Sequence, residues 1–152
     1  RSTFHNVGRW AYGLLHDGEE IPNFEEAHSN RKLALLSCAY INLKKTTGGR
    51  RATREVNSFA KAHSSFLRQQ ILSIAPDVVV LGGTYDIVKE AVFPELKKVS
   101  HRVHVVDRLP FINASHPACT MTRKIVYEQV TESFLGYREQ LSSKACDQSC
   151  QG

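Results

Sequence analysis

The stretch Asp77-Val-Val-Val-Leu-Gly-Gly-Thr-Tyr85 joins an apolar run to two glycines and the start of an expected helix. Its run of valine and leucine predicts a short strand that is buried on both faces of a parallel sheet. Gly82 and Gly83 follow the strand directly, and a helix is expected from about Tyr85, with Asp86 favourably placed in its first turn. A buried strand that turns straight into a helix is typical of an α/β layer structure.

Further helices and strands are expected on both sides of this stretch. The apolar run Leu33–Ile41 predicts another strand covered on both faces, preceded by a polar loop from 17 to about 30. Apolar residues at helical spacing over 56–74 predict one helix that ends before Pro76 and places His63 on its buried side. The expected helices cover 7–15, 56–74, about 85–94 and about 122–141, and the expected strands cover 33–41, 77–81, 102–106 and 111–115. Together they predict a three-layer αβα fold with a mainly parallel central sheet of about four strands.

Length and composition fit one globular domain. The chain has 152 residues, of which 41% are apolar, and 20 Lys or Arg against 15 Asp or Glu give a formal charge of +5. A chain of this size can bury a core without disulfides or metal. We expect a single domain over 1–141 and a polar, flexible tail over 142–152. No apolar run approaches the roughly 20 residues of a membrane-spanning helix and no signal peptide opens the chain, so a soluble intracellular monomer is expected.

The four cysteines are Cys38, Cys119, Cys146 and Cys150. They are too few and too scattered for the disulfide framework of a small secreted domain, which favours a reducing compartment. Cys146 and Cys150 are close enough to form half of a metal site, but neither a C-x-x-C pair nor a paired histidine accompanies them. Ordinary thiols are therefore expected, with no metal ion and no other cofactor.

The residues after each expected strand are the candidates for a site, because ligands of open α/β sheets lie beyond the carboxyl ends of the strands. Asn42 follows the strand at 33–41, and its side-chain amide carries an acceptor and a donor that can match the edge of a nucleobase. Capping the strand is the alternative role. Gly82 and Gly83 bring backbone amides close to a ligand, and Thr84 opens a helix whose N-terminus favours an anion such as phosphate. A simple tight connection is the alternative there.

His116 and Pro117 close the last expected strand. The proline biases the histidine toward extended geometry, and the imidazole can donate a hydrogen bond to charge that develops on a leaving group. A structural turn is the alternative. Basic side chains gather after two of the strands, where they can bind a phosphodiester backbone, with solvated loops as the alternative. These residues are Lys44, Lys45, Arg50 and Arg51 in one loop, and Arg123 and Lys124 after the His-Pro turn.

Taken in chain order, the motifs at these strand ends resemble those of the uracil-DNA glycosylase superfamily. The stretches 39–45 and 115–119, Ala-Tyr-Ile-Asn-Leu-Lys-Lys and Ser-His-Pro-Ala-Cys, carry the resemblance together with the turn Gly82–Thr84. The resemblance implies that Asn42 reads the edge of uracil and that His116 hydrogen-bonds the leaving base. It also implies that the glycine turn contacts DNA phosphate.

The resemblance further implies an aromatic platform that stacks on a base flipped out of DNA, and Phe4 stands at this position. Met121 stands next to the place where the family carries an apolar side chain that pries the helix apart, and Ala118 replaces the usual serine after His-Pro. The implied partner is single- or double-stranded DNA with uracil or a damaged base, and the implied reaction needs no cofactor. The family's motif for the attacking water normally precedes the platform. Because only Arg1–Thr3 precedes Phe4, that motif is expected to be absent from these residues.

The residues leave three functions open. The first is a DNA glycosylase-like protein that binds a flipped uracil-type base and hydrolyses its N-glycosidic bond. The second is a non-catalytic nucleic-acid-binding module of the same fold, whose binding weakens steeply with salt while a uracil strand stays intact. The third is a flavodoxin-like protein that binds a small phosphorylated metabolite at Gly82–Thr84, which nucleotides or sugar phosphates should stabilise and oligonucleotides should not.

Overall fold

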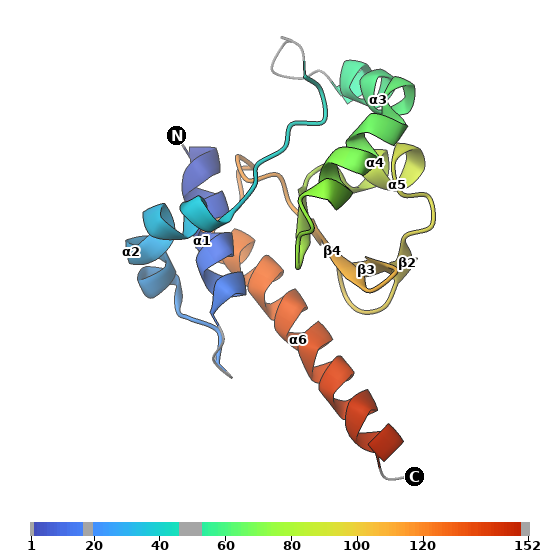
Figure 1. The fold of residues 1–152 in the computed structure, drawn as a ribbon. Helices are drawn as coiled ribbons and strands as arrows, with labels where there is room; N and C mark the ends of the chain where they lie inside the picture. Colours follow the sequence, from blue (N-terminus) through green and yellow to red (C-terminus); the bar gives the residue numbers. More distant parts are fainter. Residues whose placement is uncertain (1, 17–19, 46–52, 150–152) are drawn as a thin grey trace.

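A mixed four-stranded sheet with helices on both faces forms the centre of the computed structural model, which describes residues 2–16, 20–45 and 53–149 (Figure 1). The helices are α1 (Ser2–Leu15), α2 (Phe24–Ala34), the 3-10 turn η1 (Leu35–Ser37), α3 (Thr53–Ala62), α4 (Ser64–Ser73), α5 (Tyr85–Ala91) and α6 (Arg123–Ser149). The strands are β1 (Val79–Gly82), β2 (Lys97–Lys98), β3 (Val103–Val106) and β4 (Leu109–Ala114). These elements confirm the α/β class. No helix in the described part of the chain is long and apolar enough to cross a bilayer.

The strands lie in the order β1-β4-β3-β2, and their directions are mixed. β1 runs parallel to β4, whereas β4 pairs with β3, and β3 with β2, in antiparallel directions. Asp107 and Arg108 join β3 to β4 with positive φ angles of 55° and 112°, which is the geometry of a two-residue hairpin. A hairpin pairs its strands in antiparallel directions. The sheet is therefore not the mainly parallel one that the sequence predicted.

Each face of the sheet packs against its own group of helices, because successive side chains of a strand point to opposite faces. Leu81, Val106 and Phe111 belong to a core shared with α3, α4 and α5. Ile112 and Ala114 belong to a second core shared with α1, α2 and α6. In Figure 1, α3, α4 and α5 lie together on one side of the strands, and α1 and α2 lie on the other.

The segment expected to form the strand Leu33–Ile41 is helical in its first half, and this prediction was wrong. α2 begins where a polar loop was expected, because the Asn23 side chain accepts a hydrogen bond of 3.0 Å from the amide of Glu26 and so caps the helix. η1 continues α2, and the rest of the segment is irregular. Leu33 is 71% exposed and Leu36 84% exposed, so the apolar run does not fill a core.

The helix predicted over 56–74 is divided into α3 and α4. His63 stands at the break, exposed, with its ring 4.3 Å from that of Phe59. The prediction that His63 faces the core was wrong, because the change of helix direction removes it from the buried stripe that continues through Leu67 and Ile71. α1 and α5 lie where helices were expected. α6 extends to Ser149, beyond the boundary expected at 142, and 150–152 lie outside the described residues.

Candidate functional site

The His-Pro turn after β4 presents an exposed imidazole with a defined donor. The backbone N–H of Ala118 donates to His116 Nδ1 at 3.1 Å, and the N–H of Cys119 donates to the His116 carbonyl at 2.8 Å. Because Nδ1 accepts this hydrogen bond, the proton of the neutral ring lies on Nε2. The turn thus holds His116 in a form that can donate from Nε2 to a ligand.

The glycine turn at the end of β1 lies directly against the His-Pro turn. A Cβ atom on Gly82 would lie 2.9 Å from Pro117 Cδ, and one on Gly83 would lie 2.9 Å from His116 Cβ. Gly83 also has a φ of +71°, which favours glycine, and its N–H donates to the Ala114 carbonyl at 2.8 Å. The two glycines therefore allow the imidazole-bearing turn to approach β1. The expected contact of this turn with phosphate stays a prediction, and the amide of Gly83 is already bonded within the fold.

α1 is attached to the same turn by a buried hydrogen bond. Asn6 Nδ2 donates to the Pro117 carbonyl at 2.5 Å. Further along the helix, Trp10 Nε1 donates to the carbonyl of Val126 in α6 at 2.9 Å. These bonds hold the first turns of α1 beside the His-Pro turn. The same turns of α1 carry Phe4, the predicted aromatic platform.

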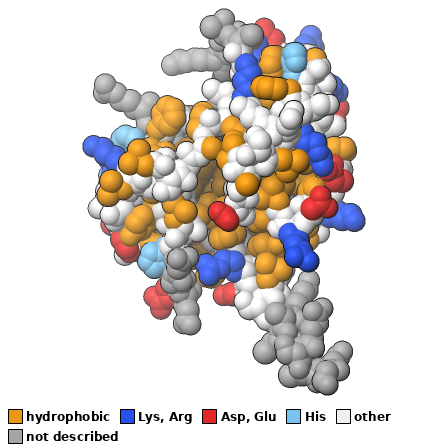
Figure 2. All heavy atoms as spheres, in the orientation of Figure 1, with side chains coloured by type: hydrophobic (Ala, Val, Ile, Leu, Met, Phe, Trp, Pro, Cys, Tyr) orange, Lys and Arg blue, Asp and Glu red, His pale blue; other side chains and the backbone are white. Residues whose placement is uncertain are grey.

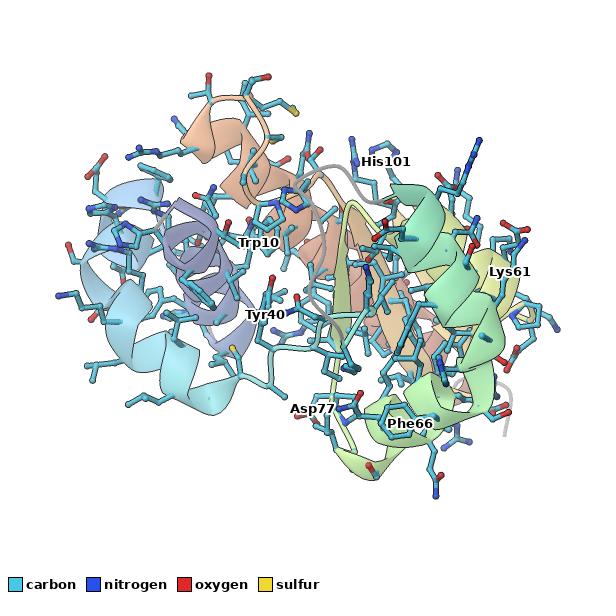
Figure 3. The ribbon with its side chains drawn as sticks, turned by 90° about the horizontal axis from the view of Figure 1, so that it is seen from above. Trp10, Tyr40, Lys61, Phe66, Asp77 and His101 are labelled. Atoms are coloured by element: carbon cyan, nitrogen blue, oxygen red, sulfur yellow. The ribbon has the colours of Figure 1, made fainter. Side chains whose placement is uncertain are left out.

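The ring of Phe4 contacts the segment that carries Asn42. Phe4 is 52% exposed, and its ring centre lies 5.4 Å from that of Tyr40. Figure 3 shows Tyr40 and Trp10 between α1 and the sheet, on the opposite side from Phe66 and Lys61. Asn42 follows Tyr40 by two residues, is exposed and stands in irregular chain, so no strand is there for it to cap. Its role in reading a base stays a prediction.

The remaining predicted nucleic-acid contacts are more scattered. Lys44 forms an ion pair with Glu55 at 2.5 Å, whereas Lys45 is exposed. Met121 is exposed, with its Sδ 3.6 Å from the Ser115 hydroxyl. Thr84 is the N-cap residue of α5 without a side-chain cap bond, and Arg123 is exposed at the start of α6. Arg50 and Arg51 lie outside the described residues.

A buried polar chain behind Asn6 was not predicted from the sequence. Arg9 Nη1 donates to Asn6 Oδ1 and Nη2 donates to His28 Nδ1, both at 2.6 Å. Arg9 is 1% exposed, and burial is the main cause that lowers its pKa. Partial burial, followed by the charges of Arg31 and Arg9, also lowers the pKa of His28. The i, i+3 spacing of Asn6 and Arg9 was the available sign, but only the packing of α2 shows that both are buried.

A cavity of about 300 Å³ lies between the β2–β3 turn and α6, and its lining residue Gln129 accepts a hydrogen bond of 3.0 Å from the Ser115 hydroxyl. It is lined by Ser100, His101, Arg102, Gln129, Glu132, Ser133, Gly136 and Gln140. None of the predicted site residues lines it. Among the described side chains, Cys38 and Cys119 are free thiols, and no group of three or more His, Cys, Asp or Glu could hold a metal ion.

The predicted site residues are therefore connected through α1, which contacts Tyr40 in the irregular chain before Asn42 and Pro117 in the His-Pro turn. The His-Pro turn in turn lies against the glycine turn. A single pocket formed by the aromatic ring of Phe4, the amide of Asn42 and the imidazole of His116 stays a prediction. Comparisons of the chain with protein-family models, with curated proteins and with solved structures find no match.

Proposed function

We propose that the protein binds a nucleobase displaced from a DNA strand and hydrolyses its N-glycosidic bond, as uracil-DNA glycosylases do. The observation that carries the proposal is the position of α1. Its Asn6 holds the turn that bears His116, while its Phe4 touches the segment that bears Asn42. One helix thereby links an aromatic ring, an amide and an imidazole. Helices on both faces of the sheet are also compatible with that superfamily.

Base recognition in this scheme depends on Phe4 and Asn42. About half of the Phe4 side chain is exposed, which offers a face on which a flipped base can stack. The exposed amide of Asn42 can accept from one base atom and donate to its neighbour, which is the pattern on the edge of a uracil ring. Lys45 and Arg123, both exposed, can neutralise phosphates of the strand that delivers the base.

His116 stabilises the leaving base. When the bond between the sugar C1′ and the base nitrogen breaks, the electron pair leaves with the base. Water adds to C1′ and releases a proton to solvent. His116 Nε2–H can donate to the base oxygen on which negative charge develops, because Nδ1 is held by the Ala118 amide. The departing base finally takes a proton from solvent.

The test is excision of uracil from single- and double-stranded oligonucleotides under single-turnover conditions. His116→Ala should slow excision about a hundredfold, the effect of losing one hydrogen bond worth roughly 3 kcal/mol in the transition state. His101→Ala is the matched control, because His101 is also exposed but lies at the cavity beside α6. Excision that His116→Ala leaves unchanged would show that the imidazole does not act on the base.

Binding measurements separate the other functions. Asn42→Ala should reduce the preference for a uracil strand over a thymine strand, because the amide supplies the paired contact. Equal affinity of the unaltered protein for both strands, without excision, would indicate a nucleic-acid-binding module. Stabilisation by nucleotides or sugar phosphates, without any by oligonucleotides, would indicate a protein that binds a small metabolite.

A further inference from the structure

Arg9 has an unusual environment for a buried cation. Nη1 donates to the oxygen of Asn6 and Nη2 to the ring nitrogen of His28, and the guanidinium carbon lies 4.9 Å from the centre of the Phe24 ring. All three neighbours are uncharged in this arrangement, because a histidine that accepts at Nδ1 carries no proton there. The third kind of N–H, at Nε, is buried without a partner.

Other positive side chains lie close to Arg9. α2 approaches α1 so closely that a Cβ atom on Gly8 would collide with the Arg31 carbonyl. The Arg31 side chain donates from Nη1 to the carbonyl of His28, whose ring accepts from Arg9. The Nε of Arg31 is also buried without a partner. After burial, the charges of Arg31 and Arg123 lower the pKa of Arg9, and Glu25 acts in the opposite direction. His5 belongs to the same surroundings, because burial and then the charges of Arg31 and Arg9 lower its pKa. We call these side chains together the α1–α2 cationic cluster: His5, Arg9, His28, Arg31 and Arg123.

Four carboxylates of the described side chains form ion pairs with other cations, and Glu25, whose charge raises the pKa of Arg9, is not one of them. The ion pairs are Lys44–Glu55, Lys61–Glu90, Arg68–Glu95 and Lys124–Glu128. Within this part of the chain, none of them includes Arg9, Arg31 or Arg123. Burying an unpaired cation is strongly destabilising, and nearby positive charge adds to the cost. An anion on the open side of the cluster would offset both effects.

We propose that the α1–α2 cationic cluster binds a phosphate group, which Arg31 and Arg123 contact directly while Arg9 attracts it from the buried side. Arginine forks match the oxygens of a phosphate. Arg123 is also the first residue of the 27-residue helix α6, whose N-terminus favours an anion. Figure 2 shows basic and histidine side chains next to one another over α1 and α2, at the upper left of the view.

The cluster is one hydrogen bond away from the candidate site, because Asn6 contacts both Arg9 and Pro117. A phosphate bound here would therefore lie near the base-binding residues. The phosphate site rests on the cluster alone, whereas its assignment to a DNA strand whose base reaches His116 rests on the proposed function.

The test is a titration with inorganic phosphate at low ionic strength, followed by NMR of the imidazole and guanidinium groups. We expect saturable changes at His5 and His28 and a rise in their pKa values, because a nearby anion favours imidazolium. Chloride at the same ionic strength should not cause them. Arg31→Gln should weaken phosphate binding about tenfold, the effect of one charge-assisted hydrogen bond. Arg123→Gln should also weaken it, and the buried Arg9 is left unaltered so that the fold is kept.

Arg138→Gln is the matched control, because Arg138 is an exposed arginine farther along α6. Phosphate binding without saturation, or equal weakening by Arg138→Gln and Arg31→Gln, would overturn the site even if uracil is excised. A second titration uses an oligonucleotide with an abasic position. If Arg31→Gln weakens this complex too, the phosphate belongs to the strand, and if it weakens only inorganic phosphate, the site takes free phosphate.

Discussion

The two helix groups bury different kinds of side chain against the same sheet. The group formed by α3, α4 and α5 meets it with an almost wholly apolar core, in which His104 is the buried polar side chain among the described residues. The group formed by α1, α2 and α6 buries Asn6, Arg9 and Thr131 in addition to its apolar residues. Apolar burial is favourable wherever it occurs, whereas a buried hydrogen bond adds little net energy but fixes position. Both groups therefore stabilise the fold through apolar burial, and the second also holds the candidate site in place.

The largest effect should come from the apolar group. Phe93→Ala removes a fully buried ring whose centre lies 4.9 Å from that of Phe111, and it should lower the free energy of unfolding by about 3–5 kcal/mol. Urea denaturation measures this change. Phe66→Ala, at an exposed position of α4, should change it by less than about 0.5 kcal/mol. Similar losses in both variants would contradict the assignment of stability to this core.

Asn6→Ala should have a smaller effect on stability and a larger one on the site. It removes the bonds to Pro117 and Arg9, so the free energy of unfolding should fall by about 1–3 kcal/mol and uracil-strand binding should weaken. Asn6→Asp is the informative control, because a carboxylate accepts from Arg9 but cannot donate to the Pro117 carbonyl. We expect it to recover stability without recovering binding. An Asn6→Asp variant that binds as well as the unaltered protein would show that the Pro117 bond does not position the turn.

Alanine substitutions at two glycines should change the stability of the fold in opposite directions. Gly83→Ala forces a left-handed φ on alanine and places Cβ against His116, so it should cost about 1–2 kcal/mol and weaken binding of a uracil strand. Gly136 stands inside α6, and its Cβ would meet no atom within 4 Å. Gly136→Ala should therefore stabilise the fold by about 0.5–1 kcal/mol without affecting the strand. Thermal unfolding with and without an oligonucleotide measures both effects.

Part of the fold could be predicted from the sequence, including the antiparallel pairing of β3 and β4, which the expected parallel sheet overlooked. Strands were expected at 102–106 and 111–115, and β3 and β4 lie there. The four residues between them are too few for a parallel crossover, so the antiparallel pairing of these strands was implied by the spacing. The run Leu33–Ile41 is different, because an apolar run of this length is compatible with a strand or a helix. Only the packing of α2 against α1 decides between them.

The candidate site was predictable where it depends on strand ends. Gly82 ends β1 and His116 follows β4, and the parallel pairing of these strands brings their ends together. The contribution of α1 was not predictable. A helix that contains Asn6 and Arg9 would normally turn such side chains toward solvent, and their burial follows from where α2 and the His-Pro turn pack.

The smallest and most gradual effect should be the loss of stability in mild acid, to which histidines of both helix groups contribute. His104 faces α5, while His28 and His5 belong to α2 and α1. Burial, then the charge of Lys89, lowers the pKa of His104, and partial burial, then Arg31, lowers that of His28. Both imidazoles titrate near 6.5 when the chain is unfolded, so below that pH the unfolded chain binds more protons than the folded one. The free energy of unfolding should therefore fall as the pH drops from about 7.5 to 5.

Urea denaturation across this range, with His104→Phe and His28→Gln, separates the two contributions. Each variant should flatten the pH dependence. Added salt should reduce the contribution of His28 to the pH dependence more than that of His104. The ring of His28 is partly exposed, so salt screens its repulsion from Arg9 and Arg31, whereas the ring of His104 is buried. If neither variant changes the pH dependence of the free energy of unfolding, His104 and His28 are not the groups that cause it.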